Sequence, residues 1–237
     1  MTTAAGAPVQ PPVLPVPVRV HLAHAVIERI ALDAGVDLLH VKGPATDPRL
    51  DPQTRSSSDV DVLVRPAHLA DFQQALAAAG WRKFSSIERG SAFSHAANWW
   101  HDHWGYVDVH AHWPGARIDA EAAYDVFAEG GYLLPIAHQP CRVPGLVAQG
   151  LLRVMHEGRS RAGDPGRLAF LEHGSWLADV ESLAQRVDAE LALAAGLGQL
   201  DRFREDPAYD LWRFFGQGGS RWAEGRGRWR AARGVRA

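Results

Sequence analysis

The sequence predicts an α+β fold, in which a small mixed β-sheet with helices on one side is followed by a helical extension. Three observations lead to this prediction. Short stretches of alternating apolar and polar residues recur between residues 37 and 143, as expected of strands buried on one face. Stretches with apolar residues at helical spacing lie between these strands, and from Pro144 onward the pattern is helical.

The N-terminal elements follow from composition and periodicity. Residues 1–18 are rich in alanine and proline and predict a disordered or polyproline-like lead-in. An amphipathic helix is expected from Arg19 to about Gly35, and a short apolar strand then runs to Val41. The segment between Gly43 and Asp59 contains several prolines, which predict a short helix broken by turns.

The remaining core elements alternate between strands and helices up to residue 143. They are expected as a strand over 59–64, a helix over 66–80, strands over 81–87, 91–98 and 106–113, a helix over 119–127, and a strand pair within 132–143. Residues 19–143 therefore form the predicted core. Residues 144–237 form the extension, with helices over 146–158 and 165–183 and an arginine-rich tail.

Composition narrows the classes of function. A formal net charge of −2 disfavours a large nucleic-acid footprint. The tail, in which arginine alternates with tryptophan, is the one segment that could bind nucleic acid, and a solvated terminus is the favoured interpretation. The single Cys141 excludes an internal disulfide and suits a reducing cytoplasm. We expect neither a signal peptide nor a membrane span, and the scarcity of lysine beside abundant arginine and alanine suggests a bacterial source.

The most informative motif is Asp59-Val60-Asp61 at the start of an apolar strand. Residues two apart on a strand share a face, so both carboxylates lie on one face, about 7 Å apart, and the valines lie on the other. Two carboxylates on a buried strand are costly to desolvate unless a cation lies between them. A pair of Mg²⁺ ions would meet this need, and an edge strand with two solvated acids is the alternative.

Two further motifs fit chemistry on phosphates. An apolar strand ends in Lys42-Gly43-Pro44, where the glycine lets a phosphate approach the backbone and a helix start offers free N–H groups. A third acid, Asp108, lies on a later alternating strand, on the face opposite to its valine neighbours.

Together these motifs resemble the DNA polymerase beta-like nucleotidyltransferase superfamily, and more closely its bacterial branch of uncharacterised nucleotidyltransferases. The resemblance covers roughly residues 20–160. It depends on Val41-Lys42-Gly43, Arg55, Asp59-Val60-Asp61-Val62-Leu63-Val64-Arg65 and Val107-Asp108-Val109-His110, with Trp113 nearby. The superfamily often has Gly-Ser where this chain has Lys42-Gly43-Pro44, and a serine from the 56–58 segment could substitute.

The resemblance implies transfer of a nucleoside monophosphate from a nucleoside triphosphate, with ATP as the first candidate, to a hydroxyl or amine of a small molecule, peptide or protein. It implies that Asp59, Asp61 and Asp108 are catalytic and hold two Mg²⁺ ions, which Mn²⁺ can replace. The residues implied in nucleotide binding are Lys42, Gly43, Arg55 and Ser58. His110 and His156 are implied in orienting groups or contacting substrate.

Two other functions stay open at this point. One is a nucleotide-binding protein without turnover, such as a partner in a toxin–antitoxin pair. The other is a zinc hydrolase that uses His110 and His112, because the run from Asp108 to His112 resembles the metal-binding strand of amidohydrolases. Those enzymes place this strand early in an eight-stranded barrel of about 250 residues. Here 107 residues precede the strand and only 125 follow it, which are too few for such a barrel.

Overall fold

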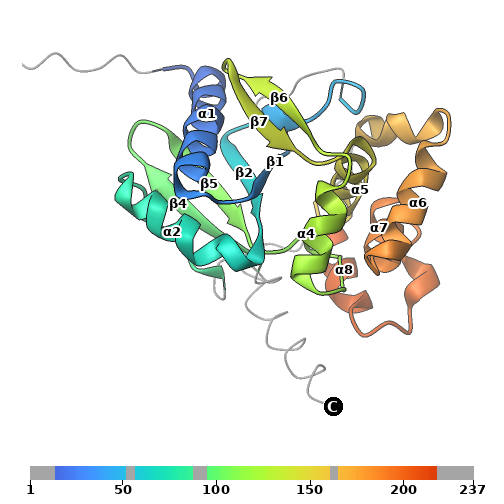
Figure 1. Cartoon of the computed structure of the whole chain (residues 1–237). Helices are drawn as coiled ribbons and strands as arrows, with labels where there is room; N and C mark the ends of the chain where they lie inside the picture. The colour runs from blue at the N-terminus through green and yellow to red at the C-terminus, as the bar shows by residue number, and fades with distance from the viewer. Residues whose placement is uncertain (1–13, 52–56, 88–94, 161–164, 218–237) are drawn as a thin grey trace, which may run out of the picture.

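The computed structural model describes residues 14–51, 57–87, 95–160 and 165–217, which form a five-stranded sheet, a two-stranded ribbon and flanking helices (Figure 1). The strand order in the sheet is β1-β2-β5-β4-β3. These strands are β1 (Leu38–Val41), β2 (Asp59–Val64), β3 (Arg82–Lys83), β4 (Ala96–His101) and β5 (Gly105–His110). The central β2 and β5 are parallel and the other neighbours are antiparallel, which confirms the predicted α+β fold with a mixed sheet.

One face of the sheet is covered by α1 (Val16–Ala34) and α2 (Leu69–Ala78). Because side chains alternate along β2, the face that carries Val60, Val62 and Val64 packs in one apolar core with Phe72 of α2. The predicted irregular lead-in through residue 18 is wrong for its last residues, since α1 begins at Val16. Proline in the first helical turn already has the φ of a helix and lacks only an N–H that would have no partner there. Residues 1–13 lie outside the described part of the chain.

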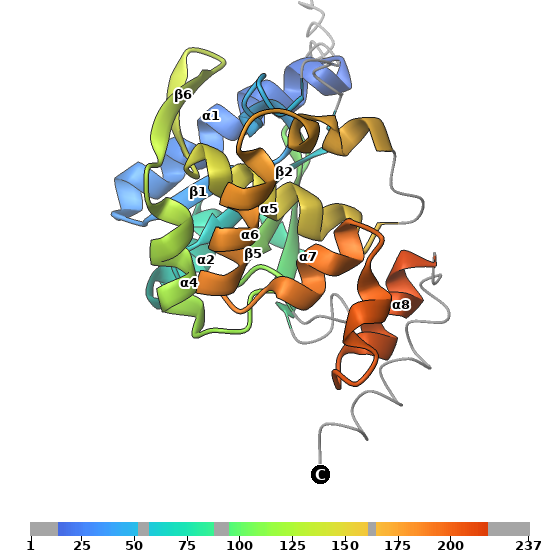
Figure 2. The ribbon, with the colours of Figure 1, turned by 90° about the vertical axis from the view of Figure 1, so that its right-hand side faces the viewer.

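The opposite face of the sheet carries Asp59 and Asp61, and the helical extension packs beside them. Leu63 of β2 and Trp113 lie in the same apolar core as Leu151 and Met155 of α5. The helices on this side are α4 (Ala120–Ala128), α5 (Leu146–Glu157), α6 (Trp176–Arg186), α7 (Glu190–Gly196) and α8 (Tyr209–Gly216) (Figure 2). Short 3₁₀ segments cover Gly43–Ala45, Pro66–His68, Pro165–Glu172 and Leu200–Phe203.

The two-stranded ribbon consists of β6 (Tyr132–Ile136) and β7 (Gln139–Val143), which pair in antiparallel fashion as predicted. In Figure 1 the ribbon stands beside α1 and β1, and β7 contacts both of these elements. Directly after β7 the chain enters α5, so the ribbon connects the sheet to the extension.

Three predicted boundaries are wrong. The strand over 81–87 reduces to the two residues of β3, and its partner β4 runs from 96 to 101, while residues 88–94 lie outside the described part. β5 ends at His110 instead of Trp113. The helix over 165–183 is interrupted, because Gly174 has a φ of +56° and α6 begins only at Trp176. Within the described residues, no helix is long and apolar enough to cross a membrane.

Candidate active site

The structure brings the three predicted carboxylates together on one face of the central parallel strands. Asp61 of β2 lies directly opposite Asp108 of β5, and Asp59 lies two residues before Asp61 on the same face. Asp61 is buried, with 5% of its surface exposed, and its two neighbours are partly buried. The alternation of β2 therefore aims three acids at the side of the sheet that the helical extension flanks.

Two basic side chains contact the buried carboxylate of Asp61. Lys42 Nζ donates a hydrogen bond to Asp61 Oδ1 over 2.6 Å, and His110 Nε2 lies 2.8 Å from the same oxygen. Burial alone would raise the pKa of Asp61, but the charge of Lys42 and the hydrogen bond from His110 outweigh it and hold this pKa below its usual value. Asp61 is therefore the ionised centre of the group.

Asp108 and Asp59 are in the opposite electrostatic situation. Burial, together with the neighbouring Asp61 carboxylate, raises the pKa of Asp108 to about 7, although Asn98 donates a hydrogen bond to it. Burial and Asp61 likewise raise the pKa of Asp59. Ser57 Oγ lies 3.1 Å from Asp59 Oδ1 and offsets part of this effect. Three carboxylates crowded on a buried face favour a bound cation.

These residues fit a divalent metal ion. The ligand atoms of Asp61, Asp108 and His110 all lie within 4.8 Å of one another. Asp59 adds a carboxylate on the same face. Carboxylate oxygens are the donors that Mg²⁺ and Mn²⁺ prefer, so the donor set agrees with the ions that the sequence implied.

The turn after β1 carries Lys42 into the site. Val41 lies opposite Asp61, so strict alternation would place Lys42 on the other face of the sheet. Lys42 instead has a φ of 62° and a ψ of 177°, a conformation that ends the alternation. Gly43 follows with a φ of 49°, and a Cβ added there would lie 2.8 Å from Ser57 Cβ. Glycine is required at this close approach of two backbone segments.

The serine that accompanies this turn is Ser57. Ser57 packs against Gly43 and donates to the backbone oxygen of Asp59 over 2.8 Å. The predicted Ser58 is exposed, and its Oγ lies 3.3 Å from Asp59 Oδ1. Arg55 lies outside the described residues.

The buried ring of Trp113 lies next to cationic side chains of the site. Lys42 Nζ lies 5.2 Å from the centre of the buried Trp113 ring, and Arg159 Cζ lies 5.4 Å from it. The rings of Trp113 and His110 are 5.1 Å apart, and Arg159 contacts His95 Nε2 over 3.2 Å. Burial lowers the pKa of Arg159 to about 10 and that of His110 to about 4. Arg159 thus stays cationic at neutral pH, whereas His110 is neutral.

A pocket of about 190 Å³ opens between the turn after β1 and helix α5. Lys42, Gly43 and Ser57 line one side, and Gln149 and His156 of α5 line the other. Burial, and then the charge of Lys42, lowers the pKa of His156 well below its ordinary value, so this predicted residue is a neutral imidazole in the pocket wall.

Two arginines that the sequence motifs did not indicate also line the pocket. Arg153 Nη2 lies 3.0 Å from Asp51, and Arg167 Nη1 lies 2.7 Å from Glu157. Their positions depend on how α5 and the following 3₁₀ segment pack, which no local pattern shows. Asn98 was also missed, although its place on the alternating strand before Asp108 was a usable signal.

The histidine-rich strand does not form an amidohydrolase site. The sheet is an open one of five strands, not an eight-stranded barrel. His110 contacts Asp61 rather than Asp108, and His112 instead packs 6.3 Å from the His95 ring. In the part of the chain that the structure describes, His112 belongs to neither group of close metal-ligand atoms.

Comparisons with known proteins place the chain at a distance from characterised relatives. No protein-family model matches the chain, and no curated protein matches it. Among solved structures it is similar to the antibiotic-resistance factor ANT(2'')-Ia, with 18% identity and a TM-score of 0.46 over 78% of this chain and 95% of that one. It is also similar to the lincosamide antibiotic adenylyltransferase LnuA bound to lincomycin, with 16% identity and a TM-score of 0.44 over 64% and 95%.

A third similar structure is an antigenic nucleotidyltransferase-like protein from Paracoccidioides brasiliensis, with 14% identity and a TM-score of 0.41 over 82% and 92%. At such low identities and TM-scores, function has to be argued from the site residues themselves.

Proposed function

We propose that this protein is a nucleotidyltransferase that moves a nucleoside monophosphate from a nucleoside triphosphate to a hydroxyl or amine. The observation that carries the proposal is the placement of Asp59, Asp61 and Asp108 on one face of two parallel strands, beside the Lys42–Gly43 turn and its pocket. Bound divalent ions would neutralise phosphate charge at these carboxylates and stabilise the transferring phosphoryl group.

Individual residues would have separate roles in the proposed nucleotidyl transfer. Lys42, together with the backbone at Gly43, would bind the leaving phosphates at the mouth of the pocket. Asp108, whose pKa is raised to about 7, would accept the proton of the attacking group. The acceptor oxygen or nitrogen bonds to the α-phosphorus, the bond from that phosphorus to the bridging oxygen breaks, and pyrophosphate leaves with the electron pair.

The pocket wall supports a triphosphate as the donor. Arg153 and Arg167 add positive charge to the side opposite Lys42, although each is paired with a carboxylate that moderates it. His110, held on Asp61 and kept neutral, would orient that carboxylate. ATP remains the first donor to test.

The test is thermal unfolding of the full chain with each of the four ribonucleoside triphosphates, with and without Mg²⁺. A ligand at 100 times its Kd adds about 2.7 kcal/mol, which for a chain of this size raises the midpoint by roughly 5–10 °C. The shift should require Mg²⁺ and disappear in the double variant Asp59→Asn, Asp61→Asn. The double variant Asp33→Asn, Asp71→Asn removes two exposed carboxylates as a matched control and should keep the shift.

Turnover is then measured as pyrophosphate release with a panel of hydroxyl and amine acceptors. Release that depends on Mg²⁺ and on Asp108 supports the enzyme. Nucleotide binding that is never followed by release would instead favour the nucleotide-binding protein without turnover. Absence of any nucleotide effect on the folded chain would contradict both.

A further inference from the structure

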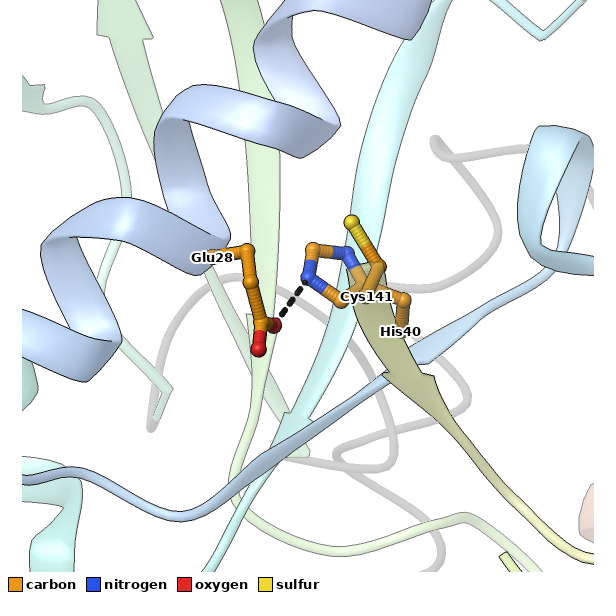
Figure 3. A group of neighbouring side chains, drawn as sticks. All are labelled: Glu28, His40 and Cys141. Atoms are coloured by element: carbon orange, nitrogen blue, oxygen red, sulfur yellow. Dashed lines mark hydrogen bonds and ion pairs between the residues drawn. The ribbon is translucent and has the colours of Figure 1, made fainter. Parts of the chain in front are cut away.

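A second cluster of potential metal ligands lies on the opposite face of the sheet from the carboxylates. It joins Glu28 of α1, His40 of β1 and Cys141 of β7, whose side chains point toward one another (Figure 3). Their ligand atoms all lie within 4.8 Å of one another, and His40 Nε2 is 2.9 Å from Glu28 Oε2. None of the three is more than 6% exposed.

We propose that Glu28, His40 and Cys141 form a structural binding site for a zinc ion. Thiolate, imidazole and carboxylate are the donors that Zn²⁺ takes in proteins, whereas a thiolate is a poor donor for Mg²⁺. The charges also balance, since one thiolate and one carboxylate neutralise a divalent ion, and a water molecule would complete the four ligands that zinc takes. Binding displaces the thiol proton of Cys141 to solvent.

The neighbouring His24 supports this arrangement. His24 is buried, and its Nδ1 lies 2.8 Å from His40 Nδ1. If His40 Nε2 binds the ion, its Nδ1–H donates to His24, as second partners of metal-bound histidines commonly do.

A zinc ion would have a mechanical role here. The ribbon of β6 and β7 has only two strands, and such a hairpin is marginally stable alone. The three ligands come from three separate elements, so one ion would tie the ribbon to the sheet and to α1. Without a metal, the buried thiol of Cys141 packs as a small apolar group.

The test is the metal content of the full chain, produced with added zinc and dialysed before elemental analysis. About one zinc per chain is expected, and cobalt in its place should give a thiolate-to-cobalt absorption band. Cys141→Ser and Glu28→Gln should reduce bound zinc at least tenfold, and removal of zinc by a chelator should lower the unfolding midpoint of the unchanged chain only. Cys141→Ala serves if the serine variant does not fold.

The matched control is Asp61→Asn, which alters the other group of ligands and should leave zinc content and the cobalt band unchanged. Zinc lost in Asp61→Asn but kept in Cys141→Ser would place the ion on the carboxylate face and overturn the proposal. A folded, zinc-treated chain without stoichiometric metal would equally overturn it and leave a hydrogen-bonded Glu28–His40–His24 cluster. Each of these zinc results can be obtained whether or not the chain binds nucleotide, so the two proposals fail separately.

Discussion

The backbone at Lys42 permits a sharp test of how the candidate active site is built. A φ of 62° with a ψ of 177° falls in a region that is essentially restricted to glycine and costs other residues about 1–3 kcal/mol. Lys42→Ala and Lys42→Gly both remove the ammonium from Asp61, so they share that loss. Only the glycine variant also relieves the backbone.

The expected order of stability is the reverse of the usual one. Glycine ordinarily lowers stability by roughly 0.5–1 kcal/mol relative to alanine, because the unfolded chain gains freedom. After this cost is subtracted from the relieved strain, we expect the free energy of unfolding of Lys42→Gly to exceed that of Lys42→Ala by up to about 2.5 kcal/mol. Urea denaturation at pH 7 without divalent metal measures this difference.

Lys83 provides the matched comparison, since it is an exposed lysine on β3 without a positive φ. There Lys83→Gly should be less stable than Lys83→Ala. If glycine is the less stable variant at both positions, Lys42 is not strained and the explanation fails. A lysine kept in a costly conformation is best explained by what its ammonium does, so neither variant at position 42 should show the nucleotide-dependent shift in unfolding midpoint.

Three further predictions address the carboxylates, the turn and the core. The folded pKa of about 7 for Asp108 lies above its ordinary 3.8, so its charged form costs stability increasingly between these pH values, up to about 4 kcal/mol above pH 7. Without metal, Asp108→Asn should therefore have a higher free energy of unfolding than the unchanged chain at pH 8, and this difference should shrink toward pH 4. A difference that stays constant between pH 4 and pH 8 would contradict the raised pKa of Asp108. Gly43→Ala should weaken nucleotide binding at least tenfold, because the added Cβ would meet Ser57. Gly130 also has a positive φ, of 64°, but has open space around it, so Gly130→Ala should bind nucleotide as the unchanged chain does. Equal nucleotide affinities of the two variants in titrations would refute the close approach at Gly43. Phe72→Ala should lower the free energy of unfolding by about 3–5 kcal/mol in denaturant while the folded chain still responds to nucleotide, and a loss below 1 kcal/mol would show that Phe72 does not fill the core.

The strands of the sheet could be predicted because their alternation is a local property. The pattern from Asp59 to Val64 fixes which side chains face α2, and the register with β5 only pairs faces that were already defined. Strand ends were harder, as β3 shows, because its two residues depend on pairing with β4. The glycine at 174 was visible in the sequence, but glycine also occurs inside helices, so the residue alone did not reveal its positive φ.

Some residues of the candidate site could also be predicted from the sequence, and others could not. Acids spaced two apart on a strand were visible in the sequence, and so was the Lys42–Gly43 turn. Arg153 and Arg167 were not, because they reach the pocket only through the packing of α5 and the segment after it. The face that Lys42 reaches was also unpredictable, since alternation alone assigns it to the wrong side of the sheet.

Because Lys42 departs from the alternation, β1 and the turn after it place side chains in both candidate sites, one on each face of the sheet. His40 points to the buried cluster with Glu28 and Cys141, while two residues later Lys42 turns back to Asp61 on the opposite face. Anything that fixes His40 also fixes the end of the strand from which Lys42 departs, and the strained turn needs such support to persist. We therefore expect chelation of zinc to weaken Mg²⁺-dependent nucleotide binding in the unchanged chain but not in Cys141→Ser, as measured by calorimetric titration. Equal binding before and after chelation would mean that the two faces of β1 act independently.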